Sequence, residues 1–292
     1  METRVLMLRK RRFARVEKTL GPLMTSTLRQ QRKLYEAPDQ PQGRPTALVA
    51  SYNIHKCVGV DGRFNPMRIM SVLREIDADL VALQEVDQRF GDRAGLLDLH
   101  AVERECGLRP VDVSGTRASH GGRGNLVLVR GGEVESVSQL ALPGAEPRGA
   151  LVVDLRLKGR PLRVIAAHLG LLRRSRASQI KALLAAADAP DGRPALLMGD
   201  LNEWRLGTRS SLQALAPRFG PLGASVASFP SRFPVWSLDR ILAAPDTMVA
   251  RITVHDTPLA HVASDHLPLK AQLHLDSVAA ESAEGGALAA SA

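Results

Sequence analysis

Polar side chains that can bind metal ions or move protons stand at the ends of the short apolar segments of this chain. Asn53 follows the apolar run at 47–52, and His168 follows the run at 162–167. When strands end at one rim of a sheet, the sheet fixes such side chains while the loops leave the site open. We therefore expect one site built from Asn53, Glu85, His168, Asp200, Asn202, Asp239, Asp265 and His266.

Three of these residues offer oxygen atoms of the kind that magnesium prefers. Mg²⁺ binds one or two carboxylates and completes its shell with waters and with phosphate oxygens of a substrate. The carboxylates of Glu85 and Asp265 and the amide oxygen of Asn53 match that preference. This set predicts a site for Mg²⁺ or Mn²⁺.

The other members of the set can handle protons and negative charge. His168 and His266 can stabilise charge or transfer protons, and Asp239 can orient a histidine and raise its basicity. Asp200 can activate a water molecule, and Asn202 can hold an oxygen of the substrate. Oxygen ligands, histidines and a water-activating carboxylate together suit metal-assisted hydrolysis of a phosphoester.

Each residue also has an ordinary structural interpretation when it is taken singly. Asn53 is typical of a turn, and Asp200 after Gly199 is typical of a turn or a helix cap. Asp239 beside Arg240 suits a local ion pair. The order and context of the whole set, rather than any one motif, favour the catalytic interpretation.

Apolar periodicity predicts the elements that must position these side chains. Continuous or alternating apolar runs predict strands at residues 47–52, 80–83, 125–130, 151–157, 162–167, 195–198, 238–242, 248–254 and 267–275. Helical spacing or composition predicts helices at residues 66–76, 97–106 and 175–187. Strands interspersed with helices favour an α/β body in which helices cover mixed sheets.

The composition excludes several classes of protein. The chain has 292 residues, of which 45% are hydrophobic and 24% charged, so it has enough apolar mass for a core and is not a disordered chain. Two cysteines are too few for a disulfide-stapled secreted domain. No apolar run approaches the roughly 18 residues of a membrane-spanning helix. Aromatic residues make up 3%, which disfavours extended base-stacking platforms.

The positive charge of the chain is concentrated at its N-terminus. Of the formal net charge of +9, residues 1–45 carry +7, with 11 basic and 4 acidic residues. Basic and apolar residues interleave there, which favours either an amphipathic helix that touches an anionic membrane or nucleic acid, or a solvated leader. The pattern does not match a secretory signal, so we expect a cytoplasmic protein, peripheral at a membrane if this arm binds one.

Breaker residues and small residues set the expected boundaries of the folded body. Pro38, Pro41, Gly43 and Pro45 form a linker, so residues 1–45 are expected to be an arm and a linker. Residues 277–292 are rich in Ala, Gly and Ser and are expected to be a disordered tail. The folded domain is expected to span residues 46–276.

Six motifs in a fixed order carry a resemblance to a known family. The motifs SYNIHK, ALQEVD, AAHLG, MGDLNEW, SLDRIL and SDHLPL resemble those of the endonuclease/exonuclease/phosphatase superfamily, which includes DNase I, sphingomyelinases and inositol polyphosphate 5-phosphatases. The resemblance covers about residues 46–276. The stretches HLGLLRR, GDLNEWR and SFPSRFPVWSLDRIL are most similar to the small bacterial members.

This resemblance implies a fold, a reaction and a role for each motif residue. The fold is a DNase I-like four-layer α/β/β/α sandwich of two packed mixed sheets, and the reaction is hydrolysis of a phosphoester with Mg²⁺ or Mn²⁺. Asn53, Glu85 and Asp265 would hold the metal. His266 would be the catalytic histidine paired with Asp239. Asp200 would orient or deprotonate water, Asn202 would contact phosphate, and His168 would stabilise the phosphorus centre or the leaving group.

Four further residues are candidates for substrate binding. His55 and Lys56 follow Asn53 and either face the substrate or lie in an exposed loop. The Gly-rich stretch at 119–125 contains Arg123 and Asn125 and follows Arg117. Its backbone N–H groups could form an anion-binding nest, although a flexible hairpin loop fits equally well.

The substrate remains open among three hypotheses. The first is a metal-dependent nuclease or phosphodiesterase, although the nearly neutral body disfavours strong duplex binding without the basic arm. The second is a phosphoesterase for a lipid headgroup or a small phosphoester, tethered to a membrane by that arm. The third is a non-catalytic scaffold, which predicts lost site residues. Neither the sequence pattern nor the resemblance indicates an obligate protein partner.

Overall fold

Two β-sheets form the centre of the structure. The computed structural model describes residues 34–36, 46–88, 94–113, 119–205, 207–222 and 226–275. A seven-stranded sheet has the order β1-β11-β12-β2-β3-β5-β4, and a five-stranded sheet has the order β10-β9-β8-β7-β6. Most of the predicted arm and all of the predicted tail lie outside the described residues.

The strands of the seven-stranded sheet come from the first and the last parts of the described chain. The strands of this sheet are β1 (Leu34–Glu36), β2 (Ala47–Asn53), β3 (Leu80–Gln84), β4 (Arg109–Pro110), β5 (Asn125–Val129), β11 (Val249–Val254) and β12 (Leu269–Leu273). β2 and β3 are parallel, whereas β12 is antiparallel to both β2 and β11. All side chains of β3 and β5 are buried, as expected for strands covered on both faces.

The five-stranded sheet is built from the middle of the chain. Its strands are β6 (Glu133–Leu142), β7 (Arg148–Leu157), β8 (Arg160–His168), β9 (Ala195–Asp200) and β10 (Asp239–Ala244). β8 and β9 are parallel, and the other neighbours are antiparallel.

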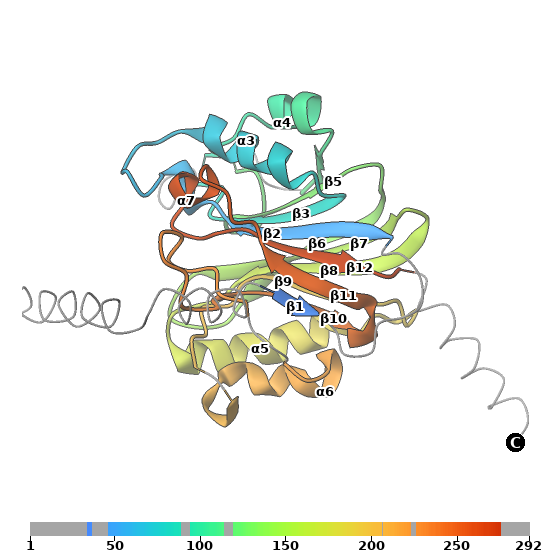
Figure 1. The fold of residues 1–292 in the computed structure, drawn as a ribbon. Coiled ribbons are helices and arrows are strands. Elements are labelled where there is room, and N and C mark those ends of the chain that lie inside the picture. Colours follow the sequence, from blue (N-terminus) through green and yellow to red (C-terminus); the bar gives the residue numbers. More distant parts are fainter. Residues whose placement is uncertain are drawn as a thin grey trace, which may run out of the picture.

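Helices cover the outer faces of both sheets and complete four layers (Figure 1). α3 (Pro66–Ile76) and α4 (Leu99–Cys106) lie over the seven-stranded sheet, and α5 (Arg173–Ala187) and α6 (Ala216–Phe219) lie over the five-stranded sheet. A short helix, α7 (Ala260–Ala263), precedes β12, and 3-10 turns lie at His55–Cys57, Gly207–Arg209, Ser211–Leu215 and Asp246–Met248. The predicted α/β/β/α sandwich is confirmed.

Alternation along β7 shows how the layers share the core. Leu151 and Val153 belong to the large core that contains residues of both sheets, of α3 and of α4. Ala150 and Val152 belong to a second core, which β7 shares with residues of α5 such as Ile180. Because successive side chains of a strand point to opposite faces, one strand supports two apolar layers.

The predicted elements are present, the short helices α6 and α7 were not predicted, and the strands that were not predicted lie at the sheet edges. Helix 66–76 is confirmed with the predicted bounds, and its N-cap Asn65 accepts a hydrogen bond from the backbone of Arg68. β6 was not predicted, because it is an edge strand whose side chains are mostly exposed and polar. β1 lies inside the predicted arm and pairs with β11.

Strand register brings the ends of both sheets to one place. Asn53 pairs with Gln84 where β2 and β3 end, and His168 pairs with Asp200 where β8 and β9 end. Asp239, the first residue of β10, is the register partner of Asp200. Contacts between β2 and β9 join the two edges. Within the described residues, no helix is long and apolar enough to cross a membrane.

Candidate active site

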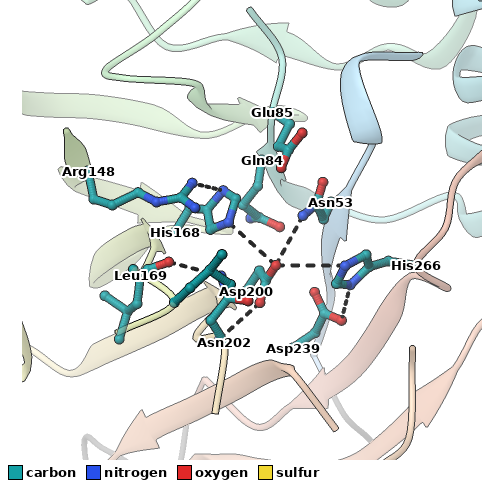
Figure 2. A network of polar contacts seen from close by, with 12 residues as sticks. Asn53, Gln84, Glu85, Arg148, His168, Leu169, Asp200, Asn202, Asp239 and His266 are labelled. Carbon is teal, nitrogen blue, oxygen red and sulfur yellow. Dashed lines mark hydrogen bonds and ion pairs between the residues drawn. The ribbon is translucent and has the colours of Figure 1, made fainter. Parts of the chain in front are cut away.

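The carboxylate of Asp200 lies at the centre of the predicted site (Figure 2). Its Oδ2 accepts a hydrogen bond from Nδ2 of Asn53 at 3.1 Å, which links the two sheets directly. The same oxygen lies 3.5 Å from Nε2 of His168 and 3.8 Å from Nε2 of His266. Its Oδ1 accepts from the backbone N–H of Asn202 at 3.0 Å. Both distances from Asp200 to the imidazole nitrogens exceed the length of an ordinary hydrogen bond. The carboxylate and the two rings therefore lie close together without a hydrogen bond between them.

His168 is held as a neutral imidazole. Arg148 lies with Nη1 3.1 Å from Nδ1 of His168, and a guanidinium can only donate, so Nδ1 is the acceptor. The ring proton is therefore on Nε2, which points toward Asp200. Burial lowers the pKa of His168 from its ordinary 6.5 to about 4. The carboxylates of Asp200 and Glu85 oppose this shift, whereas the positive charge of Arg148 adds to it.

His266 is held in the opposite protonation state. Its Nδ1 lies 2.8 Å from Oδ2 of Asp239, which is itself buried. Burial alone would lower the pKa of His266, but the carboxylates of Asp239 and Asp200 outweigh it and raise that pKa to about 10. Ser228 donates a short hydrogen bond to the same oxygen of Asp239. The ring of Phe229 lies against His266 with its centroid 4.7 Å away.

Asn202 is placed by an unusual backbone conformation. Its φ is +51°, a left-handed value that asparagine tolerates better than most residues. The turn directs its Nδ2 to the carbonyl oxygen of Leu169 at 2.9 Å, so the loops after β8 and β9 are joined. Glu85, immediately after β3, also has a left-handed φ of +58°. Such values at non-glycine residues are typical of positions that the surrounding structure must hold for function.

The three predicted metal ligands lie at this edge, and each has a partner. Asn53 accepts the backbone N–H of His55 at its Oδ1, at 3.0 Å. The carboxylate of Glu85 forms a short ion pair with Nζ of Lys56. Burial alone would raise the pKa of Glu85, but the hydrogen bond and positive charge of Lys56 help to lower it below its ordinary value, so this carboxylate is ionised. Asp265 lies with Oδ1 3.8 Å from Nδ1 of His55.

The structure also groups a second set of ligand atoms that the sequence assigned to catalysis. One ligand atom from each of Asp200, Asp239 and His266 lies within 4.8 Å of the others, and all three residues are buried. Oδ1 of Asp239 is buried without a hydrogen-bond partner. A buried, unpaired carboxylate oxygen is costly unless a cation or a donor satisfies it. Two carboxylates and one imidazole form a donor set that fits a divalent cation once His266 has given up the proton on its free ring nitrogen.

The four candidate substrate-binding residues differ in their surroundings. The side chains of His55 and Lys56 are 38% and 35% exposed beside the site. Arg123 is exposed. Asn125 is buried, and its Nδ2 donates to the carbonyl oxygens of Gly122 and Gly149 at 3.1 and 2.9 Å. Their substrate contacts stay predictions, and Arg117 lies outside the described residues.

Two site residues were missed in the sequence. Arg148 stands at the start of β7, and only the register of β7 with β8 brings it beside His168. Ser228 lies in the stretch SFPSRFPVWSLDRIL, which already resembled the bacterial branch of the family, so that stretch was a usable signal. No local pattern in the sequence marks Arg148.

Comparisons with known proteins agree with this geometry. The model of the family described as "Endonuclease/Exonuclease/phosphatase family" matches residues 50–266 of the chain. The uncharacterised protein YbhP of Escherichia coli (strain K12) is 31% identical over 267 residues, which cover 82% of this chain and 100% of that protein.

Solved structures share the fold at low sequence identity. An endonuclease/exonuclease/phosphatase from Beutenbergia cavernae DSM 12333 superposes with a TM-score of 0.58 at 22% identity, covering 79% of this chain and 72% of that chain. A mannosyl-6-phosphatase of Bacteroides thetaiotaomicron VPI-5482 superposes with a TM-score of 0.60 at 18% identity, covering 78% and 100%. These likenesses support the fold and leave the substrate open.

Proposed function

The chain belongs to the endonuclease/exonuclease/phosphatase family, whose members are phosphoester hydrolases, and we propose that it hydrolyses a phosphodiester bond by attack of an activated water molecule. The activity that we favour is that of a nuclease or phosphodiesterase. The observation that carries this proposal is the convergence of Asn53, His168 and His266 on one carboxylate oxygen of Asp200. A carboxylate held between two imidazoles of different charge suits proton transfer to and from a phosphoryl centre.

The two imidazoles take different parts in this proposal. His266 is protonated at neutral pH, so its Nε2 can donate a hydrogen bond or a proton to an oxygen of the phosphoryl group or of the leaving group. His168 is neutral and directs its Nε2–H toward the same space. Asp200, whose carboxylate lies between the two rings, accepts the proton of the attacking water.

The metal belongs to the proposal as a resident cofactor. The residues predicted to hold it are Asn53, Glu85 and Asp265, and the group of Asp200, Asp239 and His266 is an alternative position. A divalent cation there would polarise the phosphoryl oxygens and offset the negative charge that develops on them. The chain's own residues then supply orientation and proton transfer, as described above.

The test is hydrolysis by the purified full chain with Mg²⁺ or Mn²⁺. The substrate panel holds plasmid DNA, single-stranded DNA, RNA, bis-p-nitrophenyl phosphate and phospholipid vesicles. His266→Ala protein, purified identically, controls for contaminating nucleases. We expect metal-dependent cleavage of a nucleic acid that the variant lacks.

The other outcomes of this panel reject specific parts of the proposal. Turnover of the lipid or the small diester alone would reject the nuclease assignment and keep the reaction. Equal cleavage by wild type and His266→Ala protein would reject the assignment of the site, provided that circular dichroism shows both proteins folded.

A further inference from the structure

The loops at the catalytic edge of the five-stranded sheet carry large apolar side chains that are exposed. Leu171 and Leu172, which follow β8, are 56% and 55% exposed, and Trp204, which follows β9, is 45% exposed. Phe233 and Trp236, in the loop that leads to β10, are each 47% exposed. We call these five side chains the apolar rim. Single exposed apolar residues are common, but several in adjacent loops mark an interaction surface.

Sheet register places these three loops side by side. The parallel pair His168 and Asp200 ends β8 and β9 at the same edge. Asp239 pairs with Asp200, so β10 begins where β9 ends. The loops at 169–172, 201–205 and 229–238 therefore all leave the edge that carries the candidate active site. The rim therefore lies at the same edge of the sheet as the candidate active site.

A buried arginine fixes the part of the rim after β8 and β9. Arg176 is fully buried and donates to the carbonyl oxygens of Gly170 and Leu171 at 3.1 and 2.7 Å. Its guanidinium pairs with Glu203 at 3.3 Å and lies 5.3 Å from the ring centroid of Trp204. The backbone is thus held in a shape that keeps these side chains outward.

The loop before β10 has its own internal support. Phe229 stacks on Trp236 with ring centroids 6.0 Å apart, and backbone hydrogen bonds join these two residues. The ring of Phe229 also lies against that of His266. Trp236 and Phe233 are therefore presented to solvent by a folded loop.

The charged side chains exposed in these loops are all positive. Residues 169–178 contain no acidic residue, and the acidic residues in 201–211 and 228–240, Glu203 and Asp239, are both buried. The exposed charged residues in these ranges are Arg173, Arg174, Arg209 and Arg232. An apolar surface bordered by arginines matches a partner that is apolar inside and anionic at its surface.

Two kinds of partner have that character, and the rim favours one of them. A nucleic acid would use stacking on Trp204, Phe233 and Trp236. Leu171 and Leu172 have no aromatic face, whereas insertion into lipid removes their apolar surface from water. Tryptophan settles at the lipid–water boundary, and arginine binds anionic headgroups. We propose that the apolar rim docks the folded domain onto an anionic lipid bilayer, with the sheet edge that carries the candidate active site facing the headgroups. This proposal does not depend on the reaction.

Vesicle binding of the full chain tests the proposal. The probes are vesicles of phosphatidylcholine with and without phosphatidylglycerol, separated by sedimentation. We expect binding to the anionic vesicles and an about tenfold weaker partition for Leu171→Ser/Leu172→Ser protein, because the variant loses two half-exposed apolar side chains that lipid would remove from water. Arg173→Glu/Arg174→Glu protein should bind more weakly and lose the dependence on salt.

Matched control variants come from the opposite end of the sheet. Val134 on β6 is exposed and pairs with Leu155, near the end of β7 that lies away from the site. Arg160 begins β8, whereas His168 ends it. Val134→Ser and Arg160→Glu protein should bind vesicles as wild type does.

Tryptophan emission gives a second measurement that separates the partners. The chain has two tryptophans, and both belong to the rim. We expect emission to shift to shorter wavelength and to be quenched by brominated lipid when anionic vesicles are added, and Trp204→Phe protein should lose part of that signal. A shift on single-stranded DNA with no response to vesicles would overturn the proposal in favour of a nucleic-acid surface.

The remaining alternative is that the basic N-terminal residues, rather than the apolar rim, bind the vesicles. If the leucine and arginine variants bind vesicles as wild type does, the rim is not the docking surface and the proposal is wrong. If neither wild type nor variants bind anionic vesicles, it is wrong as well.

Discussion

Asp239 and Asp200 are register partners in β10 and β9, and both direct a carboxylate oxygen at the imidazole of His266. Asp239 holds Nδ1 at 2.8 Å, and Asp200 lies 3.8 Å from Nε2. A ring between two carboxylates is stabilised in its doubly protonated form, even though it is buried. The pairing of β9 with β10 in the five-stranded sheet thus determines the protonation state of His266, although His266 lies on the loop that leads into β12 of the seven-stranded sheet.

Replacing Asp239 by Asn should lower the pKa of His266 from about 10 toward the range of an ordinary histidine. The amide removes the nearer of the two negative charges, while burial still opposes protonation. NMR titration of the histidine ring protons, with EDTA present, measures this pKa. Turnover should fall about 10²-fold or more, the usual contribution of a positioned acid. An unchanged pKa would show that Asp239 does not hold the ring.

The stability of the EDTA-treated protein should depend on pH through the same pair. The folded pKa of His266 is raised above its ordinary value, so the stabilisation is fully present below about pH 6.5 and is lost as pH rises toward about 10. Urea unfolding should show the wild-type advantage over Asp239→Asn protein shrinking across that range. A constant difference between the two proteins would contradict this expectation.

Metal affinity should distinguish the two candidate ligand groups. We expect Glu85→Gln protein to bind Mn²⁺ at least about tenfold more weakly, because a carboxylate ligand becomes a neutral amide. His266→Ala protein should bind Mn²⁺ nearly as wild type does. Isothermal titration calorimetry measures both affinities without reference to activity. The reverse ranking would move the metal to Asp200, Asp239 and His266.

The buried ion pair of Arg176 and Glu203 should dominate the stability of the loops beside the site. Neither side chain is exposed, so Arg176→Met protein removes a guanidinium from a buried carboxylate that keeps only the donors of Ser211 and Arg205, and it should lose about 3 kcal/mol of unfolding free energy. Arg104 on α4 is the matched control, because its pair with Glu105 is exposed and Arg104→Met should cost less than about 1 kcal/mol. Equal losses in urea unfolding would contradict this argument.

Gly199 should be the least replaceable glycine near the site. Its φ is +148°, and an added Cβ would lie 1.8 Å from the carbonyl oxygen of Ala167 on the neighbouring strand. Gly199→Ala should therefore cost more than about 3 kcal/mol and separate β8 from β9. Gly62→Ala is the control, because Gly62 has positive φ with nothing within 4 Å and should cost about 1–2 kcal/mol. Thermal unfolding compares the two variants.

The sequence predicted the buried elements well because burial imposes a pattern. β3 and β9 are continuous apolar runs, and α3 has helical apolar spacing, so each was found within one or two residues of its bounds. The edge strand β6 carries Glu133, Glu135 and Ser136, and such a strand needs no apolar repeat. Such an edge strand forms because a neighbouring strand pairs with it, and this pairing leaves no apolar pattern in the sequence.

The same distinction between a local sequence pattern and a tertiary arrangement applies to the site residues. Residues at strand ends, such as Asn53 and Asp200, are marked by the apolar runs before them, and the structure brings both together. The position of Arg148 beside His168 depends on register between two strands, and the charge of each histidine depends on burial. Those properties arise only when both sheets are assembled, so motif order could not supply them.

β12 lies between β11 and β2 in the seven-stranded sheet, although it is the last described strand of the chain. A ribosome therefore makes β2 long before it makes β12, the neighbour of β2 in the sheet, and Asp265 and His266 come just before β12 in the chain. Until residues 265–273 have been made, the sheet lacks its strand between β11 and β2, and the site lacks Asp265 and His266. Formation of the complete sheet and formation of the complete site therefore depend on the same late strand.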